Sequence, residues 1–358
     1  MTQILAVVSM PPPITGQATA ARMLIEALDD AGVDHVVFDT ASPVDSAGVV
    51  PALRSVGRTL ANVARLATTK HAGRDTIAYF QLGQGPSSIL RDLPMLTVAA
   101  ARRWRIIGHL HGGGWRTGLD QVPAPLRRLY LRVLERSDTI VILAPRLAVM
   151  FDGLGLSDRL RVIGNGVERH LALAAVEHPS RWSDRPTVVF LSNLMPEKGI
   201  DTFLDAARLA VEEQPALRFV VAGGADAPVD TSSWPANVVY RGVVHGADKE
   251  SLLAEAQLLA LPTRYWVEGE PISILEAFHF GLPVVSCDQG GIADLVGPDN
   301  GAIVPANDPV ALLGAIVINT IDRERWEQVS DANRRQARSE HSLDAHLAAM
   351  FDLFGVSA

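Results

Sequence analysis

Three glutamates lie close together in the stretch TRYWVEGEPISILEAFHFGLPVVSC, residues 263–287. Glu268 and Glu270 fall in an expected loop, and Glu276 falls in the first turns of a helix that Pro271 can begin, because its fixed φ suits a first turn. The free N–H groups of a helix start favour phosphate, and carboxylates accept hydrogen bonds from hydroxyls. A sugar nucleotide carries both kinds of group, so this stretch predicts a site for one.

Acidic residues also gather at helix starts for structural reasons, because the helix dipole stabilises each by about 0.3–1 kcal/mol. This explanation covers Glu268 and Glu270 taken singly. It explains Glu276 less well, because Ala277 and Phe278 follow it on a helix that is expected to be buried. We therefore favour a binding function for the stretch.

With 358 residues, of which 48% are hydrophobic, the chain favours two domains over one. No apolar run reaches the ~18 residues of a membrane span, and the start, MTQILAVVSMPPP, lacks the basic segment of a signal peptide. The single cysteine, Cys287, ends an expected buried strand, which favours a structural thiol in a reducing compartment. Together these features predict a cytoplasmic protein, and no Cys/His cluster has the spacing of a zinc site.

The charge is divided unevenly along the chain. Residues 1–170 contain 19 Lys and Arg against 14 Asp and Glu, a net charge of +5, whereas residues 171–358 contain 13 against 26, a net charge of −13. The basic excess is small and lacks interleaved aromatic residues, so a nucleic-acid partner is not expected. Basic residues gather at two places in the first half: Arg54, Arg58 and Arg65 on a helix expected over 51–70, and Arg102, Arg103 and Arg105 before a strand. They are either a solvated surface or a reversible contact with anionic membrane or an acceptor phosphate.

Short apolar runs alternate with amphipathic segments in both halves, which predicts two parallel, doubly wound sheets in an α/β protein. Residues 168–186 are polar and poor in helical pattern, and we expect them to link the two domains. The expected strands cover residues 4–8, 35–38, 77–82, 105–110 and 138–143 in the first half, and 187–194, 217–222, 237–240, 258–261 and 284–286 in the second.

Two loops of the first half have the residues of a ligand site. In HLHGGGW, His111 directly follows the strand 105–110, at the strand end where α/β ligand sites form. His109 lies two residues deeper on the same face, and we expect it to pack beside His111. Gly16 stands in a loop between a strand and a helix, a phosphate-binding geometry. That loop has no G-x-G-x-x-G, which counts against a nicotinamide-dependent dehydrogenase.

Four motifs together resemble the family-4 retaining glycosyltransferases: two glutamates separated by seven residues and followed by G-L-P-V-V, P-E-K-G at 196–199, H-G-G at 111–113 and N-G-V at 165–167. The resemblance implies a GT-B fold, in which two Rossmann-like, doubly wound domains face each other across a cleft. It implies an N-terminal acceptor-side domain over 1–167 and a C-terminal nucleotide-sugar-binding domain over 168–341. The last helix, about 342–358, is then expected to pack back on the first domain.

The resemblance also implies roles for single residues. Lys198 would bind the donor diphosphate, Glu276 the ribose hydroxyls and Glu268 the transferring sugar, with His111 near that sugar and the backbone of Gly16 near the phosphate. The implied catalytic residues are His111, Lys198 and Glu268, and the implied donor-binding residues are Gly16, Asn193, Lys198, Arg264, Glu268, Ile272, Ser273, Ile274 and Glu276.

Two positions depart from the family pattern. Asn193 stands where the family has an arginine, five residues before its lysine, and asparagine brings no charge to a phosphate. Either Arg264 substitutes for that arginine, or the donor site is weaker or altered. Glu270 replaces a usually apolar residue and adds negative charge.

The implied activity is transfer of a sugar from a nucleoside-diphosphate sugar, the co-substrate, to a glycan or lipid-linked acceptor, with no other cofactor and no metal. Positive side chains and helix N-termini would neutralise the leaving diphosphate. The sequence offers no convincing covalent nucleophile, which favours a front-face displacement with retention. The alternative is a nucleotide-sugar-binding partner subunit with little or no turnover, which Asn193 motivates. The nucleotide, the sugar and the acceptor are not fixed by the sequence.

Overall fold

The computed structural model describes residues 2–12, 15–41, 49–69, 75–225 and 227–357, and only the backbone of residues 49–53. The chain divides into two compact units, Met1–Asn165 with His346–Ala358, and Gly166–Ala345. The sequence predicted domain boundaries at 167 and 341. Each unit contains a six-stranded sheet, and within the described residues its neighbouring strands pair in parallel, so the predicted α/β class with two doubly wound sheets is confirmed.

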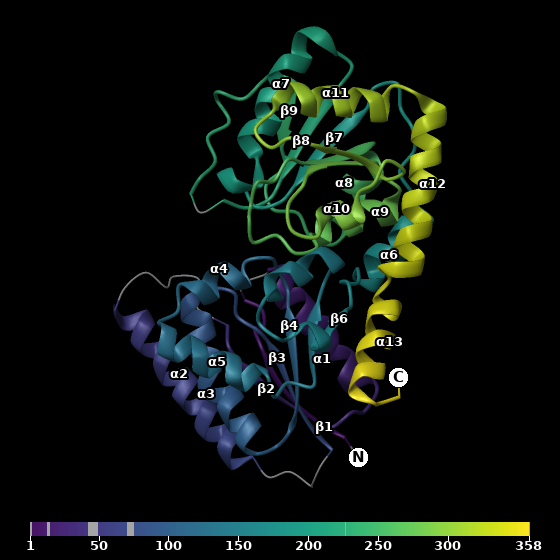
Figure 1. Cartoon of the computed structure of the whole chain (residues 1–358). Helices are drawn as coiled ribbons and strands as arrows, with labels where there is room; N and C mark the ends of the chain where they lie inside the picture. The colour runs from purple at the N-terminus through teal and green to yellow at the C-terminus, as the bar shows by residue number, and fades with distance from the viewer. Residues whose placement is uncertain (1, 13–14, 42–48, 70–74, 226, 358) are drawn as a thin grey trace. The chain divides into compact units, whose positions relative to one another are not determined.

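The first unit has the strand order β2-β1-β3-β4-β5-β6 (Figure 1). All five strands expected for this half are present, and β6 is a sixth strand at the edge of the sheet. Its elements are β1 (Gln3–Val8), α1 (Gly16–Asp30), β2 (His35–Asp39), α2 (Val49–Thr68), β3 (Thr76–Gln81), α3 (Pro86–Ala101), β4 (Arg105–Leu110), α4 (Trp115–Asp120), α5 (Ala124–Leu134), β5 (Thr139–Ile142), the 3-10 helices η1 (Pro145–Phe151) and η2 (Ser157–Arg159), and β6 (Leu160–Val162).

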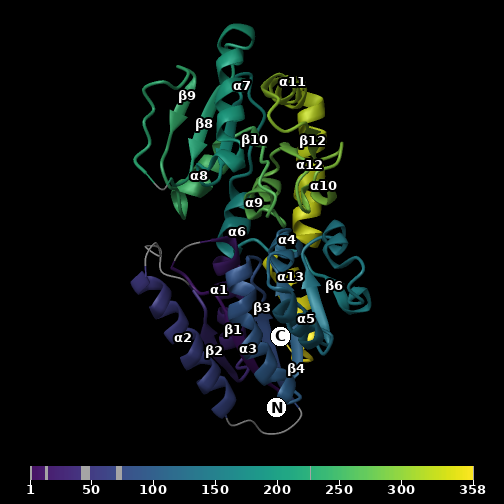
Figure 2. The same ribbon diagram turned by 60° about the vertical axis from the view of Figure 1, so that its left-hand side comes forward.

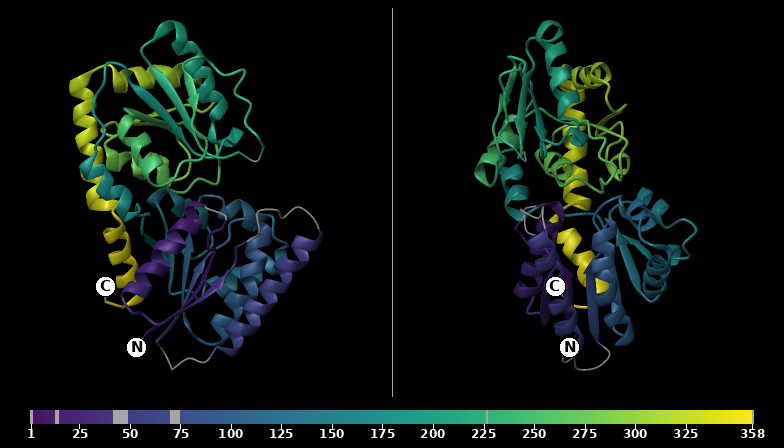
Figure 3. Two further views of the ribbon diagram at one scale, coloured as in Figure 1. Left: turned by 180° about the vertical axis from the view of Figure 1, so that it is seen from behind. Right: turned by 90° about the vertical axis from the view of Figure 1, so that its left-hand side faces the viewer.

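Helices cover both faces of this first sheet. Along β1, Ile4, Ala6 and Val8 pack into one cluster with α1, and Leu5 and Val7 pack into another. This alternation follows from the two-residue period of a strand. Helix α13 (Leu343–Phe354) contributes side chains to the α1 cluster, on the face seen from behind in Figure 3. Helices α2, α3 and α5 lie side by side on the opposite face (Figure 2).

The second unit has the strand order β12-β11-β10-β7-β8-β9. Its helices pack in two groups, α7 with α11, and α9 with α6, α8 and α12. Its elements are α6 (Arg169–Glu177), β7 (Thr187–Leu191), the 3-10 helix η3 (Pro196–Lys198), α7 (Ile200–Glu213), β8 (Arg218–Ala222), β9 (Val238–Tyr240), α8 (Ala247–Glu255), β10 (Leu258–Leu261), α9 (Ile272–Phe280), β11 (Val284–Cys287), α10 (Ile292–Leu295), β12 (Gly301–Val304), α11 (Pro309–Thr320) and α12 (Arg323–Glu340).

The prediction of a helix-poor linker over 168–186 is wrong for its first half. Residues Arg169–Glu177 form helix α6, and its Leu171 and Ala175 are buried in the core of the second unit. These two residues are four apart and therefore share one face of a helix. The apolar run LALAAV at 171–176 supplies this stripe, and a polar linker does not account for it.

Each sheet reverses its strand order at one place, and such a switch point is where α/β proteins bind ligands, beyond the carboxyl ends of the strands. In the second unit the switch lies between β7 and β10. Lys198 follows β7, and the loop with Glu268 follows β10. In the first unit the switch lies between β1 and β3, next to β4, whose end leads into His111. The fold thus places the predicted site residues at the strand ends that form ligand sites.

Candidate functional site

Lys198 and Glu268 form an ion pair, with 2.7 Å between Nζ and Oε1. Glu268 is buried, and the hydroxyl of Thr263 donates to the same carboxylate oxygen at 2.9 Å. The ammonium group also lies 4.8 Å from the centre of the Tyr265 ring. The structure therefore brings together a cation expected to bind diphosphate and a carboxylate expected to bind sugar, although 70 positions separate them in the sequence.

Glu276 lies on α9 and forms a second ion pair, with 2.7 Å between its Oε1 and Nζ of Lys249. Burial raises the pKa of the Glu276 carboxyl, and the nearby Lys249 opposes that shift. Lys249 is in the first turns of α8, and no motif in the sequence marks it as a site residue. Glu268 and Glu276 are thus both buried carboxylates with a lysine partner.

The start of α9 offers backbone donors. Pro271 precedes the helix, and no side chain of the described residues caps its first turn. Ile274 is one of the residues predicted to bind the sugar donor. Its N–H already donates a hydrogen bond to the carbonyl of Pro271. Ile272 and Ser273 remain partly exposed at the positive end of the helix, where an anion is stabilised.

The Arg264 guanidinium is already paired with side chains of the second unit. Its guanidinium makes two hydrogen bonds to the carboxylate of Asp201, at 3.1 and 2.9 Å, and a third to Oδ1 of Asn307 at 2.8 Å. Asn193 is exposed just after β7, and its carbonyl accepts from the N–H of Met195 at 2.8 Å. For Arg264 to replace the missing arginine, it must share its charge with Asp201.

Gly290 supports the loop that carries Glu268. It has a φ of +54°, and a Cβ at this position would lie 2.0 Å from the carbonyl oxygen of Glu268. The next residue, Gly291, donates its N–H to the carbonyl of Gly269 at 2.8 Å. The turn after β11 therefore packs directly against the backbone of the donor-side loop.

Glu270 is turned toward a histidine. Its Oε1 lies 3.7 Å from Nδ1 of His341, and both side chains are buried. His341 in turn accepts at its carbonyl from the N–H of Val167 at 3.1 Å. The extra negative charge noted in the sequence therefore has a polar neighbour within the second unit.

In the first unit, His111 is held from the side by Gln81. The Gln81 amide accepts from the N–H of Ser9 at 3.0 Å and donates to the carbonyl of Gln17 at 3.1 Å. These two bonds fix which end of the amide is the donor. The same amide nitrogen lies 3.3 Å from Nε2 of His111, which is therefore the acceptor.

His111 stacks on His109, with 4.0 Å between the ring centres, as the sequence predicted for this pair. Burial and the nearby His346 lower the pKa of His111 to about 3, although a hydrogen bond with Asn165 opposes the shift. The imidazole is therefore neutral at physiological pH. It can donate or accept a hydrogen bond, but it does not supply a positive charge.

Gly16 is the first residue of α1 and is exposed. The preceding Thr15 caps the helix, and its Oγ1 accepts from the N–H of Ala18 at 3.1 Å. The loop before it extends from β1, so Gly16 lies at a helix start beyond a strand end, as expected. Residues 13 and 14 of this loop lie outside the described residues.

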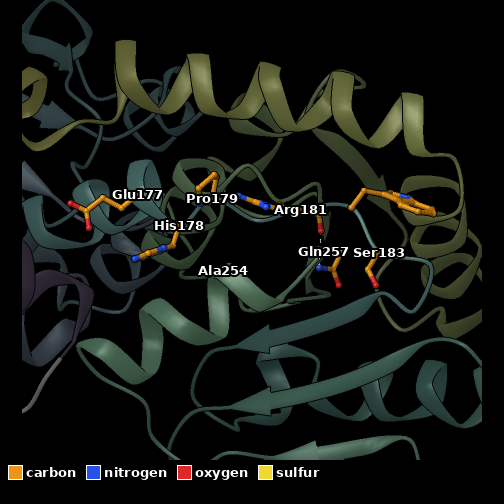
Figure 4. Close-up of a pocket in the computed structure, with 8 residues that line it drawn as sticks. Glu177, His178, Pro179, Arg181, Ser183, Ala254 and Gln257 are labelled. Carbon is orange, nitrogen blue, oxygen red and sulfur yellow. Dashed lines mark hydrogen bonds between the residues drawn. The ribbon is translucent and has the colours of Figure 1, made fainter.

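A cavity of about 410 Å³ lies elsewhere on the second unit, between residues 177–183 and the end of α8 (Figure 4). Gln257 in its wall donates to the carbonyls of Arg181 and Glu255 and accepts from the N–H of Thr187. The Gln257 amide thus links three backbone segments by hydrogen bonds. None of the predicted site residues lines this cavity.

Two features of the described residues concern metal binding and membrane insertion. None of their His, Cys, Asp and Glu side chains form a group of three or more that could hold a metal ion. No helix in the described parts of the chain is both long and apolar enough to cross a membrane.

Residues 185–319 match the family of group 1 glycosyl transferases. Over the whole chain, the fold is similar to that of Anabaena HepE solved with UDP, at a TM-score of 0.71 and 15% identity, covering 99% of this chain and 100% of that one. It is also similar to sucrose-phosphate synthase from Thermosynechococcus elongatus, at a TM-score of 0.73 and 17% identity over 99% and 98% of the two chains. The fold is therefore GT-B.

Curated relatives of this chain include two mannosyltransferases. O-antigen chain mannosyltransferase C of Escherichia coli is 27% identical over 249 residues, 62% of this chain and 64% of its own length. A GDP-mannose-dependent α-(1-6)-phosphatidylinositol monomannoside mannosyltransferase of Mycobacterium tuberculosis is 26% identical over 279 residues, 72% of this chain and 71% of its own. The chain thus spans less than two thirds of the E. coli relative.

Three residues that hold predicted site residues in place could not be selected from the sequence. Lys249, Gln81 and His346 each contact or approach a predicted site residue. They lie on different elements and 27 or more positions away from the residues they hold. Only the sheet order and helix packing bring them there, so no local pattern could have selected them.

Proposed function

We propose that this protein is a retaining glycosyltransferase that moves a sugar from a nucleoside-diphosphate sugar to an acceptor in cell-envelope polysaccharide or glycolipid synthesis. The observation that carries the proposal is the Lys198–Glu268 pair at the switch point of the second unit, with 2.7 Å between the charged atoms. The names of two relatives, in O-antigen and phosphatidylinositol mannoside synthesis, support the acceptor class.

Lys198 and the N–H groups of Ile272 and Ser273 bind the donor diphosphate, because they supply positive charge at the start of α9. Glu276 accepts from the ribose hydroxyls. Glu268, released by Lys198 as the lysine turns to the phosphate, accepts from hydroxyls of the transferring sugar. Positive charge and helix dipole stabilise the departing diphosphate without a metal.

The acceptor oxygen attacks the anomeric carbon on the face from which the diphosphate departs. The C–O bond to the diphosphate breaks, the new glycosidic bond forms, and a donor phosphate oxygen takes the acceptor proton. Configuration is thereby retained. His111 is a neutral hydrogen-bonding group beside the sugar, because its pKa is lowered to about 3 by burial and by His346.

A donor panel tests this function. Purified protein is incubated with UDP-glucose, UDP-galactose, UDP-N-acetylglucosamine and GDP-mannose, and release of the nucleoside diphosphate is measured with and without EDTA. We expect slow release from one donor, unchanged by EDTA, and an α-configured product by NMR from an α-linked donor. A product of inverted configuration contradicts the retaining mechanism, and loss of release with EDTA contradicts the role given to Lys198 and α9.

The second candidate is a nucleotide-sugar-binding partner subunit with little turnover. The pairing of Arg264 with Asp201, together with Asn193 at the position of an arginine, favours it, because the phosphate site then has one strong cation fewer. Tight binding of a donor without release of nucleoside diphosphate, in the same panel, supports this candidate over the enzyme.

We further propose that the acceptor is lipid-linked and that the protein visits the inner face of the plasma membrane reversibly. Exposed apolar residues lie on α2 (Val56, Leu60) and α5 (Leu126, Leu129), on the same side of the first sheet. Arg54 on α2 and Arg128 and Arg132 on α5 are exposed beside them. Arg58, Arg65 and Arg102 also donate to main-chain carbonyls, and Arg105 binds the carbonyl of Leu353, so these four contribute less to such a surface than the sequence suggested.

A further inference from the structure

Three histidines from distant parts of the chain gather in the first unit. His109 and His111 stand at the end of β4, and His346 stands on α13. The ring of His109 lies 4.0 Å from that of His111 and 6.5 Å from that of His346, centre to centre, with angles of 29° and 30° between the ring planes. His111 is the predicted site residue, and the other two lie behind it.

His346 is buried, and its Nδ1 lies 2.7 Å from the carbonyl oxygen of Gly164. Nδ1 therefore carries the proton and donates it, which fixes the ring orientation. The rest of α13 cannot shift easily, because Met350, Phe351 and Phe354 are buried in the cluster with α1. The helix thus holds a hydrogen-bond donor in a fixed place at the Gly164 carbonyl.

Gly164 directly precedes Asn165, and the Asn165 side chain is the hydrogen-bonding partner of His111. Asn165 is itself buried. A bond that holds the Gly164 carbonyl therefore also sets the position of the next side chain, which contacts the imidazole. On its other side His111 is held at Nε2 by Gln81, whose amide is fixed by Ser9 and Gln17.

We propose that His346 is a positioning residue for His111. It acts in two ways, by fixing Gly164 and Asn165 through its hydrogen bond and by closing the ring stack behind His109. This inference rests on the proposed function, in which His111 lies beside the transferring sugar. It assigns to the C-terminal helix a part in setting the site, beyond covering the first sheet.

The test reads His111 directly, without a substrate. Protein labelled with ¹⁵N at its histidine rings is studied by NMR, and His111→Gln identifies the His111 signals. His346→Leu removes the donor, whereas His346→Asn keeps a donor near the position of Nδ1. We expect His111 to be a fixed Nδ1–H tautomer in the wild type and in His346→Asn, and to shift toward a tautomer mixture with a higher apparent pKa in His346→Leu.

His341→Gln is the matched control, because His341 is equally buried, lies five residues earlier in the same segment and contacts Glu270 instead of the histidine cluster. Its His111 signals should equal those of the wild type. Unchanged His111 signals in a folded His346→Leu protein, or equal changes in His341→Gln, overturn the proposal. If His346→Leu does not fold, His346→Gln replaces it, because the glutamine amide holds its N–H donor one bond further from the backbone than Nδ1 of His346. Unchanged His111 signals in His346→Gln, or equal changes in His341→Gln, then overturn the proposal.

Turnover separates positioning from stability. With the donor that the panel identifies, His346→Leu should lower kcat by about tenfold, as expected when a reacting group is misplaced, and leave the KM for the donor unchanged. His346→Asn should restore most of that loss. Equal kcat loss in the leucine and asparagine variants contradicts the proposal. If no donor binds the wild type, the proposed function fails, while the NMR result still decides the role of His346.

Discussion

At the scale of single residues, the donor-side site consists of buried charges that are paired within the protein. Glu268 has Lys198 and Thr263, and Glu276 has Lys249. Such pairs contribute little net stability, because desolvation offsets their attraction, but removing one partner leaves a costly buried charge. This makes the Lys198–Glu268 pair suited to exchange, since a diphosphate can replace the carboxylate beside the lysine while sugar hydroxyls donate hydrogen bonds to the carboxylate.

Lys198→Ala should weaken binding of the nucleoside diphosphate by about 10- to 150-fold, because a hydrogen bond to a charged group contributes about 1.5–3 kcal/mol. Turnover should fall with it, since the same charge stabilises the leaving group. Titration calorimetry with UDP and GDP measures the loss. Arg208→Ala is the control, because Arg208 is an exposed arginine of the same unit, paired with Asp205. Equal affinity of Lys198→Ala and Arg208→Ala would remove Lys198 from the site.

Replacing Glu268 and replacing Glu276 should affect the binding of different parts of the donor. Glu276→Gln should weaken binding of free UDP or GDP by about fivefold or more, because the ribose loses a charged acceptor. Glu268→Gln should leave that binding nearly unchanged and lower sugar transfer. Calorimetry with the free nucleotide, beside turnover with the full donor, makes the comparison. Equal weakening of free nucleotide in both variants contradicts the assigned roles.

His111 should make folding stability sensitive to acid. Its pKa is about 3 in the folded chain and near 6.5 when unfolded, so the unfolded state binds a proton over that range and the native state does not. Stability from this group is therefore fully present above pH 6.5 and declines as the pH falls toward 3. Urea unfolding at pH 7.5 and pH 5 should show a smaller difference for His111→Gln than for the wild type. An equal difference in both proteins would show that His111 is not held neutral.

The site residues that could be predicted from the sequence are those that stand in a short sequence motif. Glu268, Glu276, Lys198 and His111 each stand in a motif that the sequence displays, and all four lie at strand ends or helix starts of the expected kind. Arg264 lies beside the motif, but its pairing with Asp201 depends on how the loop after β10 meets the first turn of α7. Side-chain partners of that kind follow from tertiary packing, which no spacing in the sequence encodes.

At the scale of elements, the loop that carries Glu268 is packed against the turn that contains Gly290 and Gly291. Gly290 and Gly291 lie directly against the backbone of the loop after β10. The strands were predictable, because apolar runs bounded by glycine and proline have one plausible form in an α/β chain. The close contact of Gly290 was not, since a glycine in a sequence does not reveal what approaches it.

Gly290→Ala should displace the loop and impair transfer. Its φ of +54° costs an L-residue about 1–2 kcal/mol, and the new Cβ would lie 2.0 Å from the Glu268 carbonyl. We expect Tm to fall by roughly 2–8 °C and turnover to fall more than free-nucleotide binding. Gly297→Ala is the control, because its Cβ would come no nearer than 3.6 Å to the nearest neighbour, Asn300. Similar turnover in the two variants would show that the loop tolerates the change.

At the scale of the whole molecule, charge and apolar exposure are unevenly distributed along the chain. The first 170 residues carry +5 and the remainder −13. Within the first unit, α2, α3 and α5 cover one face of the sheet, and four of the exposed large apolar residues lie on α2 and α5 (Figure 2). Apolar residues beside unpaired arginines are the features that bind an anionic lipid surface. The sequence indicated the arginines of α2, but not those of α5, which lie next to Leu126 and Leu129.

This surface should bind anionic vesicles weakly and reversibly. Each basic residue near an anionic membrane contributes about 1 kcal/mol, less at high salt, so Arg54, Arg128 and Arg132 together give partial binding. We expect the protein to float with vesicles of phosphatidylglycerol at low salt, to float less at high salt, and not to float with phosphatidylcholine. Changing these three arginines to glutamine should abolish flotation, and Leu129→Gln should weaken it. Changing Arg335 and Arg338, exposed on α12, should leave flotation unchanged. Equal recovery with both lipids, or equal loss in both sets of variants, would leave a soluble acceptor as the better explanation of the first unit.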